Sequence, residues 1–310
     1  MFSGASNFST GVDKTFLFII GISFFFLLAL TTIMIVFAFK YNRKKHPKAV
    51  QVKDNIFLEV TWTVIPTLLA LLMFYYGYEA FIPERHPPKD AIQVKVIAKM
   101  WSWSFDYGDG KIVNDTLVVP LGKAVQLNLT SIDVIHSLYI SAFRIKEDVV
   151  PGKPGMMWFI AQKIGQYDIL CAEFCGVRHS YMEGIVKVVP VDDYTTWLSN
   201  LKTSNNTAGP KGLVLIQQNA CIGCHSLDGS KLVGPSFKDL YNREEIVITE
   251  GKERKIKADD AYIRNSIINP NADVVKGFNG GMMISYKGIL NDSAINEIIL
   301  YIKQISGKPN

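Results

Sequence analysis

Four cysteines of this chain fall into two close pairs, and a histidine follows each pair. The first pair is Cys171 and Cys175 in the segment CAEFCGVRHSYM, which also contains His179 and Met182. Thiolate, imidazole and thioether groups all bind soft or borderline metals. Spacing alone leaves three interpretations open: copper, zinc with His136 as a further ligand, and a disulfide between the two cysteines. Met182 favours copper, because zinc seldom takes a thioether ligand.

The second pair lies in CIGCH, residues 221–225, which is the attachment signature of c-type haem. It predicts thioether bonds from Cys221 and Cys224 to the haem and an iron bond from His225. The helical pattern before the motif and GPSF (234–237) after it resemble class I cytochromes c, where this proline lies against the proximal histidine.

In cytochromes of that class the other iron ligand is usually a methionine in M-P-x-[FY], and a methionine raises the reduction potential. The segment FNGGMMISYKGIL aligns Tyr286 with the aromatic residue and therefore Met283 with the ligand, with Met282 as the second candidate. Ile284 replaces the usual proline. The resemblance also implies a haem-packing segment that contains Tyr262, Ser266, Ile267 and Pro270.

Two uncharged runs near the N-terminus are long enough to cross a bilayer. Residues 15–39 carry no charge, and residues 60–78 form a second run that contains Pro66, which a membrane helix tolerates. A signal peptide is not expected from the first run, because it is too long and lacks a basic region before it and a small-residue cleavage site after it. The mean hydropathy of +0.16 is high for a chain without membrane segments.

The loop between the two runs is strongly basic, with Asp54 as its one acid and Arg43, Lys44, Lys45, Lys48 and Lys53 as its cations. The positive-inside rule therefore predicts a cytoplasmic loop, with both termini and everything after about residue 80 outside the cytoplasm. The net charge of only +5 gives no reason to expect nucleic acid as a partner.

The remainder of the chain predicts two further domains. The segments AIQVKVIAK, VQLNL and GIVKVVPV alternate or are rich in β-branched residues, which indicates a β-sandwich or barrel. SNNTAGPKG is typical of a linker, and the last hundred residues are helical in pattern, with a charged surface hairpin expected within 242–260. The predicted parts are residues 1–87 with helices at about 15–40 and 57–79, residues 88–203, a linker at 204–211, and residues 212–310.

Five segments resemble subunit 2 of the haem–copper cytochrome c oxidases: LEVTWTVIP (58–66), WSWSFDY (101–107), DVIHS (133–137), KEDVVPGKPG (146–155) and CAEFCGVRHSYM (171–182). The resemblance covers about residues 10–200. With the fused cytochrome it extends to the caa-type oxidases. It implies a two-helix transmembrane hairpin, a cupredoxin-like β-barrel with the dinuclear copper centre CuA, and an all-α class I cytochrome c domain.

The resemblance also implies a role for individual residues. Cys171 and Cys175 would bridge both coppers through their thiolates, which spreads one unpaired electron over two metals and keeps reorganisation small. His136 and His179 would each bind one copper, and Met182 and the backbone carbonyl of Glu173 would be weak axial ligands.

Three further roles follow from the resemblance alone. Trp101 corresponds to the exposed aromatic residue over CuA where electrons arrive, and Glu59 to a carboxylate at the mouth of a proton pathway into subunit 1. Glu173 would also help to bind magnesium at the interface with subunit 1.

The function that the resemblance implies is electron input to a proton-pumping terminal oxidase of the bacterial cell membrane. Electrons would pass from a cytochrome c or a quinol-oxidising complex to the covalent haem, then to CuA and to haem a of subunit 1, where dioxygen is reduced at the haem a/CuB site. Subunits 1 and 3 and membrane lipid are the expected partners. A similar subunit of a CuA-containing nitric oxide reductase, a free-standing membrane electron carrier and a zinc-stabilised sensor are the alternatives.

Overall fold

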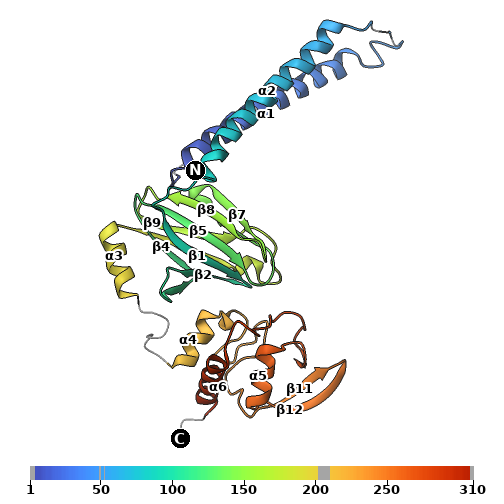
Figure 1. Ribbon diagram of the computed structural model, residues 1–310. Helices are drawn as coiled ribbons and strands as arrows, with labels where there is room; N and C mark the ends of the chain where they lie inside the picture. The colour runs from blue at the N-terminus through green and yellow to red at the C-terminus, as the bar shows by residue number, and fades with distance from the viewer. Residues whose placement is uncertain (1–3, 49, 52, 202–209, 308–310) are drawn as a thin grey trace.

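The computed structural model describes residues 4–48, 50–51, 53–201 and 210–307. They form three parts: a long helical hairpin, a β-sandwich at its base, and a smaller domain on the far side of the sandwich (Figure 1). The predicted linker at 204–211 lies mostly outside the described residues. The order of the parts agrees with the predicted fold class.

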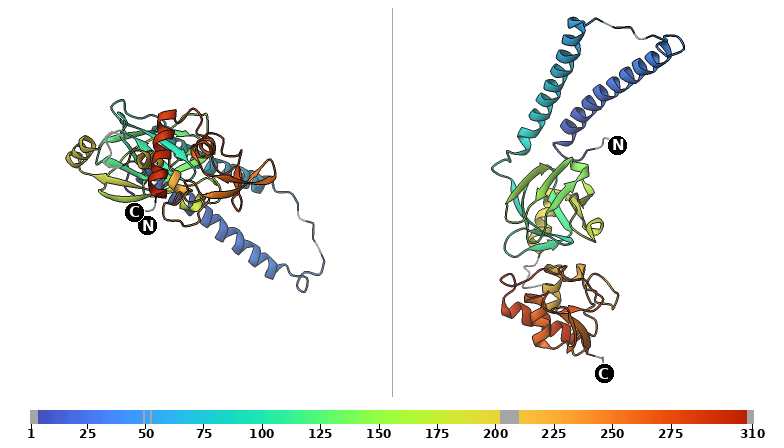
Figure 2. Two further views of the ribbon diagram at one scale, coloured as in Figure 1. Left: turned by 90° about the horizontal axis from the view of Figure 1, so that it is seen from below. Right: turned by 90° about the vertical axis from the view of Figure 1, so that its right-hand side faces the viewer.

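The hairpin consists of helices α1 (Ser9–Lys40) and α2 (Ile56–Glu84), which are long and apolar enough to cross a membrane. Near the sandwich the two helices touch, with the Phe18 and Tyr76 rings 5.4 Å apart, and they splay apart towards the basic loop (Figure 2). Most of their apolar side chains are exposed in the single chain, as expected of surfaces that face lipid or other subunits.

The base of the hairpin is fixed to the sandwich by several contacts. The Phe8 ring packs edge-on against Trp158 at 5.0 Å, and the Trp158 indole donates a hydrogen bond of 2.9 Å to the carbonyl of Pro83 in α2. Arg144 forms an ion pair of 2.8 Å with Asp13 in α1. The sandwich is therefore held close to the predicted membrane surface from both helices.

The sandwich contains two five-stranded sheets whose alternating side chains meet in one core. Strand β5, for example, buries Val125, Leu127 and Leu129 on one face. This alternation is the pattern predicted from the sequence. The first sheet has the order β3 (Ile112–Asn114), β2 (Ser102–Asp106), β1 (Ile92–Lys99), β5 (Ala124–Ser131), β8 (Gly155–Ile160), and the second β4 (Thr116–Pro120), β10 (Glu183–Val189), β9 (Gly165–Cys171), β6 (His136–Ile140), β7 (Ile145–Val149).

After helix α3 (Val191–Asn200) the third part is helical, as predicted, and also carries a small sheet. Its first and last helices cross so closely that a Cβ atom on Gly212 would clash with the carbonyl oxygen of Glu297. The expected hairpin is present as two antiparallel strands, and a short third strand joins them. The elements are α4 (Lys211–Gln218), β11 (Glu244–Thr249), β12 (Lys252–Lys257), α5 (Asp260–Ile268), β13 (Val274–Val275) and α6 (Asp292–Ser306).

Candidate metal centres

The first candidate centre lies where two neighbouring strands of the second sheet end. His136 is the first residue of β6, and Cys171 is the last residue of β9. These strands pair, with Leu138 opposite Cys171, so the loop after β9 folds back beside His136. The rigid sandwich thus positions two ligands at strand ends and the others on a short loop.

Sulfur and nitrogen donors of this loop gather around the two thiols. The Sγ atoms of Cys171 and Cys175 are 3.8 Å apart, and the Cys175 Sγ atom lies 3.5 Å from the Nδ1 atom of His179 and 3.8 Å from the Sδ atom of Met182. Both thiols and Met182 are buried. The sequence-predicted ligands of the loop are therefore within reach of a common metal site.

The Cys171 side of the cluster has two further donors. The Nδ1 atom of His136 lies 3.9 Å from the Cys171 Sγ atom, and the carbonyl oxygen of Glu173 lies 3.2 Å from it. His136, Cys171 and Cys175 place one ligand atom each within 4.8 Å of one another. The site thus offers two thiols, with an imidazole and a weaker donor on each side. One tetrahedral zinc would use only four of these six donors, so the set fits a pair of coppers better.

The protonation of the cluster also suits metal binding. The hydrogen bond between the two thiols lowers the pKa of Cys171 to about 3 and raises the pKa of Cys175, because one sulfur holds the proton that stabilises the other as thiolate. Among the described residues, which include all four cysteines, none forms a disulfide. Cys171 is therefore present as a thiolate, and Cys175, which is not in a disulfide, would become one when a metal displaces its proton.

Asp133 orients the histidine on the Cys171 side. Its Oδ1 atom lies 2.8 Å from the Nε2 atom of His136, so His136 donates from Nε2 and presents Nδ1 to the cluster. Burial opposes the charge of His136, but the hydrogen bonds to Asp133 and Cys171 raise its pKa. Sequence analysis missed Asp133, although its position three residues before His136 in DVIHS was a usable signal.

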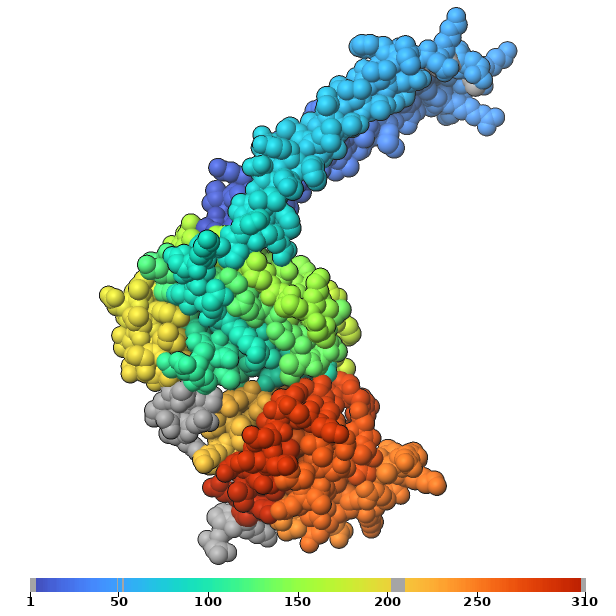
Figure 3. Space-filling model, in the orientation of Figure 1, coloured from blue at the N-terminus to red at the C-terminus, as the bar shows by residue number. Residues whose placement is uncertain are grey.

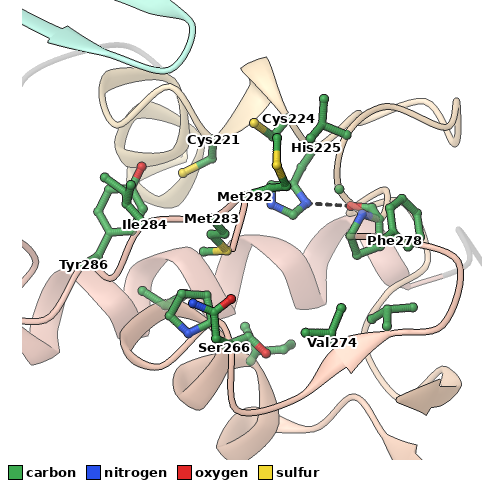
Figure 4. A pocket seen from close by; sticks show the side chains of 18 of the residues that line it. Cys221, Cys224, His225, Ser266, Val274, Phe278, Met282, Met283, Ile284 and Tyr286 are labelled. Carbon is green, nitrogen blue, oxygen red and sulfur yellow. Dashed lines mark hydrogen bonds between the residues drawn. The ribbon is translucent and has the colours of Figure 1, made fainter. Parts of the chain in front are cut away.

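The second candidate centre is a cavity in the third part, with Cys221, Cys224 and His225 on its wall (Figure 4). The three residues directly follow α4 and a short turn, which brings both thiols and the imidazole to one end of the cavity. Side chains from distant segments complete the wall, including the predicted packing residues Tyr262, Ser266, Ile267 and Pro270. A mostly apolar cavity with two adjacent thiols fits a covalently attached haem.

His225 is prepared for iron binding by its neighbours. Its Nδ1 atom donates a hydrogen bond of 2.7 Å to the carbonyl of Pro235, which leaves Nε2 free towards the cavity. Phe237 stacks on the imidazole at 4.6 Å, and a Cβ atom on Gly234 would lie 2.5 Å from the ring, so only glycine fits there. Burial lowers the pKa of His225 and keeps the imidazole neutral, the form that binds metals.

The two candidate methionine ligands differ in their packing. Both Met282 and Met283 line the cavity. Met283 packs against the core of its own domain, whereas Met282 packs against the core of the sandwich. Ile284, which replaces the usual proline, also lines the cavity, and the nearby Tyr286 hydroxyl donates to the carbonyl of Asn219 at 2.8 Å. This packing favours Met283 as the ligand.

The structure corrects one expectation about Trp101, namely that its ring is exposed. The side chain is buried, with 6 % of its surface accessible, and its indole donates a hydrogen bond of 3.0 Å to the carbonyl of Cys175. Trp101 therefore contacts the copper loop from the core of the sandwich. The residue that faces the haem-site cavity is Met100.

Glu59 and the Glu173 carboxylate lie apart from both candidate centres. Glu59 is in the first turn of α2, beside the basic loop and at the opposite end of the hairpin from the sandwich. Glu173 has an exposed side chain, although its backbone carbonyl faces Cys171. Neither carboxylate is brought to the two cysteine pairs, and their predicted roles both concern surfaces that another subunit would cover.

Comparison with protein families gives matches over most of the chain. "Cytochrome C oxidase subunit II, transmembrane domain" matches residues 2–79, "Cytochrome C oxidase subunit II, periplasmic domain" matches 110–189, and "Cytochrome c" matches 211–306. These three ranges correspond to the hairpin, the sandwich and the helical domain.

The chain is also similar to individual relatives and to a solved structure. Cytochrome c oxidase subunit 2 of Alkalihalophilus pseudofirmus is 30% identical over 73% of this chain and 70% of the relative, and that of Cereibacter sphaeroides is 27% identical over 55% and 70%. The periplasmic domain of subunit II of cytochrome oxidase from Bradyrhizobium japonicum covers 37% of this chain and 96% of that chain, at 28% identity and a TM-score of 0.36. The chain belongs to the cytochrome c oxidase subunit 2 family, with a cytochrome c domain at its C-terminal end.

Proposed function

We propose that this membrane-anchored subunit passes electrons from an external donor through a covalent haem c to a dinuclear CuA centre and on to haem a of subunit 1, which reduces dioxygen to water. When bound, the haem and the coppers supply one-electron redox chemistry. The cytochrome c oxidase subunit 2 family and the fused cytochrome c domain support electron input as the coarse role. Partnership with other oxidase subunits, subunit 1 among them, follows from the family.

One observation carries the proposed order of transfer. The cavity that contains the haem-attachment residues has Met100 and Asp133 of the sandwich in its wall. The Met100 amide donates a hydrogen bond of 2.6 Å to the Oδ2 atom of Asp133, and the Oδ1 atom of Asp133 holds His136. One residue, Asp133, thus joins the wall of the haem site to a proposed copper ligand, which supports direct transfer between the two centres.

The chain's own residues would hold the two groups as follows. Cys171, Cys175, His136 and His179 would be the principal ligands of the coppers, and Met182 and the Glu173 carbonyl would be weaker ones. Cys221 and Cys224 would anchor the haem by thioether bonds, and His225 and Met283 would bind its iron. Donors on a rigid sandwich resist movement when the metals change charge, which favours fast transfer.

Two further parts of the proposal concern contacts with subunit 1, and a third concerns the side of the membrane. Glu59 would receive protons at the cytoplasmic side for a pathway into subunit 1, and the exposed Glu173 carboxylate would help to bind magnesium at the subunit 1 interface. The sandwich and the haem domain would lie on the extracytoplasmic side, as the periplasmic domain of the family implies.

The experiment that tests this function is metal analysis and EPR spectroscopy of the purified oxidase that contains the full chain. The proposal predicts an EPR signal from one electron shared by two coppers, together with a low-spin c-type haem. Zinc in the cysteine loop, or haem without a copper signal, would overturn it and leave a membrane-anchored cytochrome with a structural metal.

A further inference from the structure

The sandwich and the haem domain are joined by hydrogen bonds at the end of α4. In the space-filling view the haem domain lies directly against the sandwich (Figure 3). The Lys99 amine donates a bond of 2.6 Å to the carbonyl of Gln218, and the Asn114 amide donates one of 2.6 Å to the carbonyl of Gln217. The last carbonyls of a helix have no N–H donor within the helix, and a positive charge is favourable beside them. The sandwich therefore caps the helix that leads into the haem-attachment motif.

A third hydrogen bond reaches the haem-attachment motif itself. The Arg178 guanidinium donates a bond of 2.6 Å to the carbonyl of Gly223, which lies between Cys221 and Cys224. Arg178 belongs to the copper loop, and its guanidinium lies 5.3 Å from the centre of the Tyr181 ring, which limits its freedom. The copper loop and the haem-attachment turn are thus joined directly.

Lys99 is buried by this arrangement, although it is the last residue of an otherwise half-exposed strand. Its exposed fraction is 5 %, and it is the one buried lysine among the described residues. Burial lowers its pKa to about 8, which means that holding the charged amine at this interface costs free energy. The hydrogen bond to the haem domain and the nearby carboxylates of Asp115 and Asp133 offset part of that cost.

The interface between the two domains also determines which residues lie between the haem site and the copper site. Cys224 and Met282 of the haem domain pack against the sandwich core, and Lys99, Met100 and Asp133 of the sandwich line the haem-site cavity. The thiol edge of the cavity consequently faces the copper loop. Separation of the haem domain from the sandwich would break all three bonds and remove Met100 from the cavity wall.

We propose that Lys99, Asn114 and Arg178 are positioning residues that act as a latch, holding the haem domain in one docked position against the copper domain. The latch rests on the proposed function, since its purpose is to fix the distance for electron transfer. The linker alone would only raise the local concentration of the haem domain. The latch selects one orientation among the many that a linker allows.

The test uses amine labelling of the purified oxidase, with Lys99 as reporter. Acetylation by an N-hydroxysuccinimide ester is followed by mass spectrometry at Lys99 and at Lys95, an exposed lysine on the same strand. Asn114→Asp removes a latch donor and places a carboxylate against the Gln217 carbonyl, while it keeps the acceptor for the Ser104 hydroxyl. Asn128→Asp, which makes the same change where the amide bonds Gln93, is the control.

The latch predicts that Lys99 reacts at least about tenfold more slowly than Lys95 in the unmodified protein, and that Asn114→Asp removes about tenfold of this protection. Haem-to-copper electron transfer, measured after photoreduction, falls in the same variant. Asn128→Asp leaves both quantities unchanged.

Two results would overturn the latch. One is equal labelling of Lys99 and Lys95 in the unmodified protein. The other is unchanged Lys99 labelling in Asn114→Asp together with unchanged electron transfer in both Asn114→Asp and Lys99→Met. The second variant reports by electron transfer alone, and Lys99→Arg should restore it. If Lys99 is protected but the unmodified protein transfers no electrons from haem to copper, the proposed function fails and the latch stands.

Discussion

The copper site and the haem site are built in different ways. The copper donors lie within 4 Å of their neighbours before any metal is considered, since Cys171 and Cys175 lie at the base of one loop on a rigid sandwich. The haem site is a cavity whose walls come from many segments between Ala220 and Ile302, and from Lys99, Met100 and Asp133 of the sandwich. A small metal site can be prepared by local contacts alone, whereas a large prosthetic group needs the whole domain around it.

The largest expected effect comes from breaking the copper site while the haem site is kept. Cys175→Ser should abolish the paired-copper EPR signal, because this sulfur is the neighbour of Cys171, His179 and Met182. Haem content, read from the absorbance of the reduced c-type haem, should stay normal. A parallel loss of haem would show that the two sites do not assemble independently.

The haem site should depend on one methionine and not the other. Met283→Leu should remove the methionine-to-iron absorption band and lower the reduction potential, because a methionine ligand raises it. Met282→Leu, which removes the same atoms one residue away, should keep the band because Met282 packs against the sandwich. The reverse result would assign the iron bond to Met282.

The two candidate ligand histidines also differ in the hydrogen-bond acceptor that orients each ring. His136 is held by a side chain, Asp133, whereas His225 is held by the backbone carbonyl of Pro235. Asp133→Asn should weaken copper binding by about tenfold to a hundredfold, because the charge that makes His136 basic is lost. Competition with a chelator measures the affinity.

Asp148→Asn is the matched control for that variant, since Asp148 is half-exposed and bonds Ser137 and Lys146 rather than a ligand. Equal losses of copper affinity in the two variants would argue for a general charge effect rather than the orientation of His136.

The smallest effect is expected from the wall of the haem cavity. Tyr286→Phe removes the hydrogen bond to the Asn219 carbonyl and should lower the free energy of unfolding of the haem domain by about 1 kcal/mol. Burial raises the pKa of Tyr286, so the hydroxyl remains a neutral donor at ordinary pH. Denaturant titration followed by haem absorbance measures the change, and an unchanged midpoint would mean that this bond adds nothing.

The sequence predicted the local parts of this molecule well. Strand alternation, the two long helices, and the hairpin at Glu244–Lys257 all follow from periods and turns within a few residues, and the structure contains them. The copper ligands were accessible for the same reason, because five of the six donors lie within or beside one loop. Only His136 had to be brought from elsewhere.

What the sequence did not predict depends on contacts between distant segments. Trp101 was expected to be exposed, but it is buried in the core of the sandwich, where its indole bonds the copper loop. Lys99 has the sequence of an ordinary strand-end lysine, and only the docked haem domain makes it a buried donor. Such docking contacts leave no periodic signal, so no reading of local pattern could find them.

The measurement that tests the central claim most directly is the time course of electron transfer in the purified oxidase after rapid photoreduction of haem c. The account predicts that haem c is reoxidised at the same rate at which the copper centre becomes reduced, before haem a of subunit 1 is reduced. Reduction of haem a without a reduced copper intermediate, or haem c that stays reduced while the copper centre fills from another donor, would contradict it.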